Sequence, residues 1–281
     1  GKEALVRIYN TNTKKIINAR FAIDNGLAAI DGDLAIPGVA GTGSPVRLEF
    51  CEPGGATTGK LLPSGNVVDT LDVPGLGKIR ASLVDAANAC CFVNAADLGL
   101  SGIEMPEVIE QSSELMDKLG KIRLAASIAM GVGKDIADAA KKNLVPFIGF
   151  ISGPQDAQSL SGVAIRSAEV DLTGRMLSDG QPHRALPLTA SLCMAVAARI
   201  KGSVVNLVVR ANQDPAAPIR IAMPSGILTV AAIVKQAGGA WHAELGAFYR
   251  TQRRLFDGFV YVRASRVPEL PRQRGGSLEA V

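Results

Sequence analysis

The sequence predicts an α+β fold, and three features of its patterning support that prediction. The first hundred residues carry strand patterns and turn signals at short intervals, with almost no helical periodicity. A helical pattern follows over residues 105–142, and a very apolar helix over residues 188–200 lies between strands. Because these strands do not alternate regularly with helices, a doubly wound parallel sheet is excluded.

The chain is long enough for two domains. Its 281 residues are 47% hydrophobic and 20% charged, which is an ordinary globular composition. A single core stops growing near about 250–300 residues, so the length admits one large domain or two of about 130 residues each. We favour two domains, because the patterning of the sequence changes near Gly102.

In the first part of the chain, short apolar runs are separated by clusters of turn residues. The cluster Asn10–Thr13 lies between two such runs, which is typical of a β-hairpin. The strands expected in this part are Val6–Tyr9, Lys15–Ile23, Val46–Phe50, Ile79–Val84 and Cys91–Val93.

The helical part opens at Met105 and contains apolar residues at helical spacing. Gly131 and Gly133 interrupt it, and the helix is expected to resume over Lys134–Lys142. Beyond it, a second apolar helix spans Leu188–Ile200, and a short basic helix is expected over Phe248–Leu255. The strands expected here are Val145–Ile151, Val170–Leu177, Val204–Arg210, Ile219–Ala222, Ile227–Ile233 and Phe259–Val262.

The composition argues against several classes of protein. The net charge is +4, but the basic residues are scattered and aromatic residues make up only 4%, which does not favour a nucleic-acid partner. The four cysteines show no CxxC spacing and there are only two histidines, so neither a disulfide framework nor a zinc site is indicated. No apolar run reaches the roughly 18 residues that span a bilayer, so we expect no membrane partner and a reducing, cytoplasmic setting.

A glycine-rich segment, Gly54–Leu61, nearly matches the phosphate-binding pattern GxxxxGK[ST]. The match fails at its last position, because Leu61 has no hydroxyl that could hold Mg²⁺. Pro63 also breaks the helix whose N-terminus would bind the phosphates. We therefore interpret this segment as a glycine-rich hairpin loop and not as a nucleotide site.

A polar break between two strands makes Asn88 a candidate for binding a substrate carboxylate. The alternative is that Asn88 only forms a turn, and the sequence does not decide between them. Cys90 and Cys91 follow at once, and the usual fate of a free cysteine is to pack as a small hydrophobic residue.

A polar loop carrying His183 and Arg184 leads directly into the apolar helix, for which Thr189 is the candidate N-cap. Free backbone N–H groups, the helix dipole and the Thr189 and Ser191 hydroxyls would together bind a carboxylate. The free N–H groups expected here belong to Ala190, Ser191 and Leu192. The alternative is that Thr189 only caps the helix and His183 lies in a surface loop.

With these segments in view, the chain resembles the family of 2-methylaconitate isomerases and 4-oxalomesaconate tautomerases. The matching pieces run in family order across nearly the whole chain, and only their combination is specific. They are Val6–Thr13, Ile36–Thr42, Thr58–Gly65, Arg123–Ala125, Met176–Ile200, Pro224–Gly226 and Arg253–Gly258.

The resemblance implies a diaminopimelate-epimerase-like fold, with two domains that each wrap a mixed or antiparallel sheet around a central helix. The substrate then lies in the cleft where the two helix N-termini face each other, and the helix of residues 188–200 belongs to the second domain. We expect residues 1–102 and 257–267 to form a first domain whose front part is missing. Residues 103–256 then form the second domain, and residues 268–281 form a tail.

The resemblance also implies a cofactor-independent isomerase or tautomerase, in which a base removes a proton from a small unsaturated di- or tricarboxylate and an acid returns it elsewhere. The substrate-binding residues expected are His183, Arg184, Thr189, Ala190, Ser191 and Asn88. The family's lysine and its cysteine in an Asn-Cys-Gly-Asn loop have no match here, so the catalytic residues are expected upstream of residue 1. No metal and no cofactor are expected, and the expected assembly is a homodimer.

Two alternative functions remain open. An amino-acid epimerase of the same fold would need a cysteine at each helix N-terminus, but Cys193 lies about one turn inside its helix. A non-catalytic anion-binding or assembly protein would need only the carboxylate-binding end of the helix.

Overall fold

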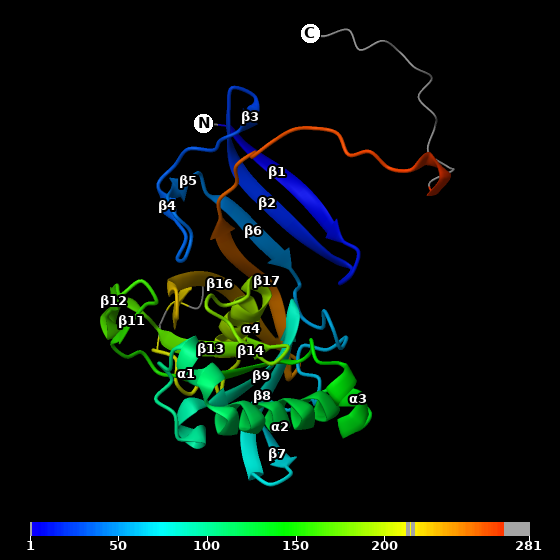
Figure 1. Ribbon diagram of the computed structural model, residues 1–281, viewed down its shortest axis with the longest axis vertical. Coiled ribbons are helices and arrows are strands. Elements are labelled where there is room, and N and C mark those ends of the chain that lie inside the picture. Colours follow the sequence, from blue (N-terminus) through cyan, green and yellow to red (C-terminus); the bar gives the residue numbers. More distant parts are fainter. Residues whose placement is uncertain (1, 212–213, 215–216, 267–281) are drawn as a thin grey trace.

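The structure is a computed structural model, and it describes residues 2–211, 214 and 217–266. Figure 1 shows two bodies, which we call the upper and the lower lobe. The upper lobe contains strands β1–β6, and the lower lobe contains all four α-helices and strands β7–β17. The predicted tail, residues 268–281, lies outside the described residues.

The upper lobe is built from long strands and short pairs. Its strands are β1 (Lys2–Asn10), β2 (Lys15–Asp24), β3 (Leu27–Ala28), β4 (Leu34–Ala35), β5 (Thr42–Gly43) and β6 (Val46–Cys51).

The lower lobe combines helices with the remaining strands. Its helices are α1 (Pro106–Gln111), α2 (Ser113–Ala129), α3 (Ile136–Lys141) and α4 (Leu188–Arg199), with 3-10 turns at Ala95–Leu98 and Ser167–Glu169. A third 3-10 turn, Ala264–Arg266, follows the last strand. The longer strands are β7 (Asp69–Val73), β8 (Gly77–Ala86), β9 (Asn88–Asn94), β10 (Phe147–Ser152), β13 (Leu172–Ser178), β15 (Ile219–Met223), β16 (Gly226–Ala237) and β17 (Ala240–Arg250), and the short ones are β11 (Ala157–Gln158), β12 (Ala164–Ile165) and β14 (Gln181–Pro182).

One continuous sheet runs through both lobes. Its strand order is β1-β2-β6-β17-β16-β15-β13-β10-β9-β8-β7. Neighbours along this path are antiparallel except β9 with β10 and β13 with β15, which are parallel. Because β17 pairs with β6 on one side and β16 on the other, it joins the two lobes. A largely antiparallel sheet with few helices confirms the predicted α+β class.

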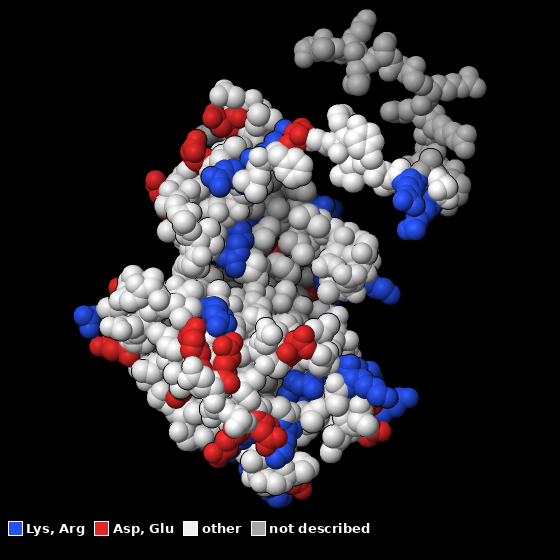
Figure 2. Space-filling model, in the orientation of Figure 1, with Lys and Arg blue, Asp and Glu red and all other residues white. Residues whose placement is uncertain are grey.

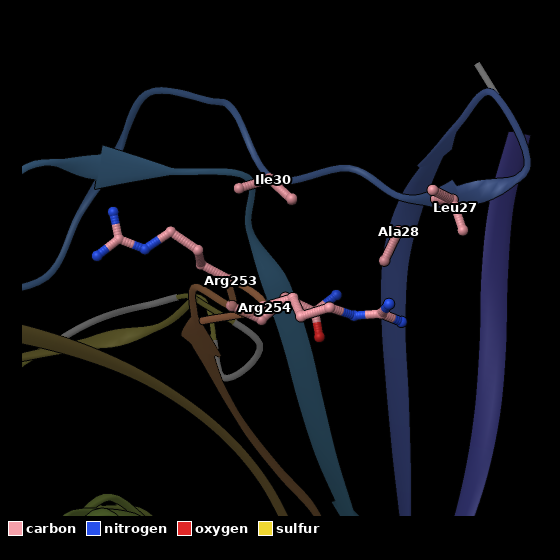
Figure 3. Close-up of a pocket in the computed structure, with 6 residues that line it drawn as sticks. Leu27, Ala28, Ile30, Arg253 and Arg254 are labelled. Atoms are coloured by element: carbon pink, nitrogen blue, oxygen red, sulfur yellow. The ribbon is translucent and has the colours of Figure 1, made fainter. Parts of the chain in front are cut away.

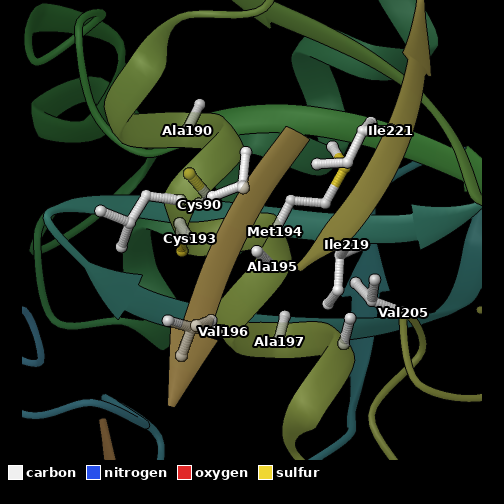
Figure 4. Packing of buried hydrophobic residues seen from close by; sticks show 14 of the residues in the cluster. Cys90, Ala190, Cys193, Met194, Ala195, Val196, Ala197, Val205, Ile219 and Ile221 are labelled. Carbon is white, nitrogen blue, oxygen red and sulfur yellow. The ribbon is translucent and has the colours of Figure 1, made fainter. Parts of the chain in front are cut away.

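Helix α4 forms the centre of the lower lobe. Its residues Ala190 to Ala197 are fully buried among side chains of β8, β9, β13, β15, β16 and β17. Figure 4 shows Cys90 of β9 beside Ala190 and Cys193 of α4. Gly246 of β17 permits this packing, because a Cβ atom there would lie 2.5 Å from the Cγ atom of Leu192.

Helix α2 covers the opposite face of the sheet. Its buried side chains pack with apolar side chains of β7, β8, β9 and β10 in a second cluster. Leu115, Leu119, Ile122 and Ala126 of α2 are buried at the helical spacing that the sequence predicts. The lower lobe is therefore layered, with α2 on one side of the sheet and α4 on the other.

Most predicted elements are confirmed, including the first hairpin and the helical part 105–142. The first helix of that part is divided at Ser112 into α1 and α2. Three predictions are wrong. Residues 204–210 form turns and not a strand, because Ser203 and Asn206 bond to the backbone of the preceding helix. Residues 248–250 continue strand β17, so the predicted helix 248–255 is absent from the described structure. Residues 259–262 form no strand there, although the sequence predicts one.

The division into two domains stays a prediction, although part of the packing bears on its boundary. Strands β8 and β9, which the sequence analysis assigns to the first domain, pack against α4 of the second. The packing therefore does not favour a boundary at residue 102. Among the described residues of the upper lobe no α-helix is found, so a sheet wrapped around a central helix is seen only for α4.

Candidate active site

The predicted start of helix α4 at Leu188 is confirmed, but its N-cap lies two residues before the predicted one. Pro187 occupies the N-cap position with φ −57° and ψ 136°, so the prediction of Thr189 as the N-cap is wrong. The physical reason is the proline itself, which fixes its own φ and keeps the residue before it out of the helical region. The helix can therefore begin at Leu188.

This shift changes which backbone N–H groups are free. The Ser191 N–H donates to the Pro187 carbonyl at 2.9 Å, so the first helical hydrogen bond is already made there. The prediction that the N–H groups of Ser191 and Leu192 are free is therefore wrong. The groups without a partner inside the helix are those of Leu188, Thr189 and Ala190, and no side chain among the described residues caps α4.

The Ser191 hydroxyl points back into the helix. It donates to the Leu188 carbonyl oxygen at 2.8 Å, and Ser191 is fully buried. Thr189, by contrast, is half-buried, and its hydroxyl lies in the first turn of the helix. Of the two predicted hydroxyls, Thr189 is therefore the better placed to contact a ligand.

His183 is half-buried just before α4. Its Nε2 atom lies 2.7 Å from the Ser178 hydroxyl, and its ring stacks on Phe147 with the centroids 6.0 Å apart. Burial lowers the pKa of His183 below its ordinary value of 6.5, because the charged imidazolium loses hydration. At neutral pH this side chain therefore offers a hydrogen bond and not a positive charge.

Arg184 faces the carboxylates of helix α1. Its guanidinium lies 3.1 Å from Glu110 and 3.3 Å from Glu107. These two carboxylates raise the pKa of Arg184 through a hydrogen bond and their charge, with Glu110 first. The two glutamates occupy part of the Arg184 guanidinium, and its role in substrate binding stays a prediction.

Asn88 lies on the side of β9 that faces α4. Side chains alternate along a strand, so Asn88 shares its face with Cys90 and Phe92, which both pack in the α4 cluster. Cys90 lies beside Ala190 in Figure 4, and Asn88 precedes Cys90 by two residues, at the start of β9. This arrangement keeps Asn88 among the candidates, although its contact with substrate stays a prediction.

The glycine-rich loop binds a carboxylate of the chain itself. The fully buried Asp85 accepts hydrogen bonds at Oδ2 from the Thr57 N–H and the Thr58 hydroxyl, both at 2.8 Å. The N–H of Gly55 also donates to the Asp85 carbonyl at 2.8 Å. These contacts use the donors that a phosphate would need, which supports the interpretation of residues 54–61 as a structural loop.

Sequence reasoning missed Asp85, which orders the loop beside the Asn88 turn. The available signal was an aspartate directly before that turn, at the end of an otherwise apolar strand. Such an aspartate rarely lies buried without partners, so donors close to it could have been expected.

The three cysteines of the core are packed away from solvent. Cys90, Cys91 and Cys193 are fully buried, and the Cys193 thiol donates to the Val84 carbonyl at 3.3 Å. Burial raises the pKa of Cys91 to about 12 and holds the pKa of Cys90 well above its usual range. The structural interpretation of Cys90 and Cys91 and the inward direction of Cys193 are confirmed.

The surface is hollowed at the junction between the lobes in Figure 2, and two cavities involve segments of the upper lobe. One, of about 490 Å³, lies between the lobes, and we call it the inter-lobe pocket; it is lined by residues 35–39, 163–165 and 225–227 together with Ser159, Ser161 and Glu169. The other, of about 460 Å³, lies between Leu27, Ala28, Ile30 and the segment 252–254. Figure 3 shows the Arg254 guanidinium extending toward Ala28 and that of Arg253 extending away from it.

No set of three or more histidine, cysteine, aspartate or glutamate side chains is placed to hold a metal ion in the described ranges. None of the helices that the structure describes is both long and apolar enough to cross a bilayer.

Comparison with known proteins identifies the family. A family described as PrpF protein matches residues 3–263. The chain belongs to this family. The family prediction from the sequence is thereby confirmed, since the relatives named below include methylaconitate and methylitaconate isomerases.

The similar proteins are bacterial isomerases. The chain is 38% identical over 264 residues to 3-methylitaconate isomerase of Eubacterium barkeri, covering 93% of this chain and 68% of that protein. It is 35% identical over 260 residues to 2-methyl-aconitate isomerase of Shewanella oneidensis, covering 92% of this chain and 65% of that protein. The chain thus spans about two thirds of the length of these relatives.

A solved structure supports the fold. The crystal structure of methylitaconate-delta-isomerase superposes with a TM-score of 0.85 and 36% sequence identity. The match covers 99% of this chain and 69% of that chain. The predicted diaminopimelate-epimerase-like fold class is confirmed, and the names of the relatives agree with the isomerase that the sequence predicts.

Proposed function

We propose that the protein is an isomerase that moves a proton on a small unsaturated di- or tricarboxylate. Acids of the kind named by its relatives, 3-methylitaconate and 2-methylaconitate, are the leading candidates for substrate. 4-Oxalomesaconate belongs to the same chemical class and stays part of the proposal. The amino-acid epimerase alternative is not favoured, because the relatives carry isomerase names and Cys193 is buried.

The observation that carries the proposal is the uncapped amino end of α4. Three backbone N–H groups, of Leu188, Thr189 and Ala190, precede the first helical hydrogen bond, and in the part of the chain that the structure describes no side chain caps them. The partial positive charge of the helix dipole is concentrated at the same place. Such an end binds a carboxylate without any metal or additional group.

A carboxylate held there would favour the proposed chemistry. When a base removes a proton from the carbon next to a carboxylate or its vinylogue, negative charge spreads onto the carboxylate oxygens. N–H donors that are already fixed in position stabilise this charge more in the transition state than in the ground state. The proton then returns at the other end of the allylic system.

We assign roles to the polar groups around this end according to whether their hydrogen-bonding atoms already have partners. The Thr189 hydroxyl and the Ala190 N–H lie in the first turn of α4, and neutral His183 and Asn88 would contact other oxygens of the acid. Ser191 contributes only by fixing the first turn, since its hydroxyl and N–H are both bonded. Arg184 holds α1 through its two glutamates.

The acid and base that move the proton are not assigned to described residues. The buried thiols of Cys90, Cys91 and Cys193 are poor candidates, because burial disfavours the thiolate. This observation keeps a second candidate function open, in which the chain binds the anion without chemistry. No cofactor is part of the proposal. The homodimer remains a prediction. The cytoplasmic location also remains a prediction, and four cysteines without disulfides accord with it.

The experiment that tests the proposal follows deuterium by proton NMR. The full chain is incubated in D₂O with 3-methylitaconate or 2-methylaconitate, with succinate as a saturated control. Deuterium entering the unsaturated acid, but not succinate, supports the isomerase. Saturable binding without deuterium supports the anion-binding alternative and overturns the catalytic proposal for this chain. Neither binding nor exchange overturns both.

A further inference from the structure

Arg250 is the last residue of strand β17, and its side chain lies on the face of the sheet that packs against helix α4. Side chains alternate along a strand, so Arg250 shares its face with Phe248, which is buried in the α4 cluster. The Arg250 guanidinium lies over the Phe248 ring, 5.7 Å from the ring centroid. A ring on one side of a guanidinium leaves the N–H donors, which point outward in its plane, available to other partners.

The half-buried guanidinium of Arg250 has no acceptor among the described residues. No carboxylate in that part of the chain pairs with it, and burial alone lowers its pKa below the ordinary value. Burial also lowers the pKa of Arg123, Arg175 and Arg199, but each of these donates to two or more backbone carbonyl oxygens. A charge that loses hydration is normally paired, so Arg250 indicates an anion that the described residues do not supply.

Arg250 lines a small cavity of about 90 Å³. The other walls of this cavity are residues 34–37 of the upper lobe, residues 227–229 of β16 and Tyr249, and most of these side chains are apolar. Residues 35–37 and Ile227 also line the inter-lobe pocket, so the two cavities adjoin. An apolar lining that includes a guanidinium fits a small carboxylic acid with an apolar body.

Arg250 and the approach to α4 lie on one face of the sheet, a short distance apart. Leu228 lines the same cavity as Arg250 and pairs with Ile221 of β15, which packs against α4. Two strand spacings therefore separate Arg250 from Ile221, which is roughly 10 Å between the backbones. Met223, farther along β15 on the same face, accepts the N–H of Leu186 at 3.3 Å, just before α4 begins. The long side chain of Arg250 can therefore reach an acid that is bound in front of this face.

We propose that Arg250 is a further substrate-binding residue, whose guanidinium donates two parallel hydrogen bonds to one carboxylate of the unsaturated acid. The inference rests on the proposed function, because the class of substrate is taken from it, but the observations on Arg250 do not involve the amino end of α4. An acid of this class has two or three carboxylates, so one carboxylate at Arg250 leaves another for the N–H groups of α4. A planar guanidinium matches the two oxygens of a carboxylate, which the ammonium group of lysine does not.

The test compares Arg250→Gln with Arg253→Gln in the full chain. Both variants remove one positive charge, and Arg253 is exposed and lines a different cavity. Titration calorimetry with 3-methylitaconate measures Kd, and thermal unfolding measures Tm. We expect Arg250→Gln to raise Kd by about tenfold or more, the usual effect of losing hydrogen bonds to a charged group. At about 0.15 M salt, which screens exposed charges, Arg253→Gln should leave Kd within about twofold.

Two further measurements separate binding from a structural role. The Tm of Arg250→Gln is expected to stay level or rise, because no described residue pairs with the charge that the variant removes. Arg250→Lys keeps the charge but loses the paired donors, so its Kd should lie between those of the wild type and Arg250→Gln. If Arg250→Lys binds no more tightly than Arg250→Gln, charge at this position does not contribute and the inference is overturned.

Each remaining outcome also decides the inference. Equal Kd values for the wild type and Arg250→Gln overturn the role of Arg250 and leave the proposed function intact. Equal losses in Arg250→Gln and Arg253→Gln indicate a general effect of charge, and a loss accompanied by a clearly lower Tm indicates a structural role; either result overturns it. If the wild type binds no unsaturated acid, the proposed function fails and the role of Arg250 fails with it.

Discussion

The buried carboxylate of Asp85 accepts a hydrogen bond from the hydroxyl of Thr58 at 2.8 Å, across 27 positions of the sequence. Two backbone N–H groups, of Thr57 and Thr58, donate to the same oxygen. The glycine-rich loop is therefore folded around an internal anion at the turn that carries Asn88.

Replacing Asp85 by asparagine is expected to destabilise the fold by about 2–4 kcal/mol, because the amide cannot accept three donors as a carboxylate does. Thr58→Val removes only one of these donors and should cost about 1 kcal/mol. Urea unfolding followed by circular dichroism measures both. Equal midpoints for Asp85→Asn and the wild type would show that the loop is not held by this carboxylate.

Gly246→Ala is expected to lower stability by about 1–3 kcal/mol, since the new methyl group would lie 2.5 Å from the Cγ atom of Leu192 in α4. Gly120→Ala is the matched control, because Gly120 lies inside α2 with open space around its Cα. There alanine should raise stability by about 0.5–1 kcal/mol. Chemical unfolding of the two variants checks the opposite signs, and a neutral Gly246→Ala would contradict the packing of α4 on β17.

Stability should depend on pH through His183. Burial lowers its pKa below the ordinary value of 6.5, so the unfolded chain binds the proton more tightly than the folded one. The stability that neutral His183 contributes is complete above about pH 6.5 and is lost as the pH falls through its folded-state pKa. Tm measured from pH 7.5 to 5.0 should therefore fall more steeply in the wild type than in His183→Gln. Parallel curves would count against a buried neutral histidine.

Thiol labelling of the native chain should be selective. Cys51 is half-buried, whereas Cys90, Cys91 and Cys193 are fully buried, and burial raises the pKa of Cys91 to about 12. We expect iodoacetamide at pH 8 to modify Cys51 first and the other three only after unfolding in urea. Peptide mass spectrometry reads the order, and early modification of Cys193 would contradict its inward direction.

The sequence predicted α4 and its neighbours well because their apolar periodicity is strong and uninterrupted. It misplaced the N-cap because a threonine usually outranks a proline at that position, whereas here Pro187 has extended backbone angles and the helix begins directly after it. The run Val204–Arg210 has the composition of a strand, but side-chain bonds from Ser203 and Asn206 hold it in turns. Such tertiary contacts override local propensity.

The partners of the candidate site residues could not be read from the sequence. Nothing local indicates that Arg184 pairs with Glu110, 74 positions earlier, or that the loop donors bind Asp85. Charge and hydrogen-bond complementarity between distant segments is set by the fold.

The central claim is that the free N–H groups at the start of α4 bind a carboxylate. The most direct test titrates 3-methylitaconate into ¹⁵N-labelled protein and follows the amide resonances of Leu188, Thr189 and Ala190. Saturable shifts of these three, larger than that of the Ser191 N–H already bonded to Pro187, are the predicted result. Saturable shifts elsewhere that leave these three amides unmoved would contradict the claim.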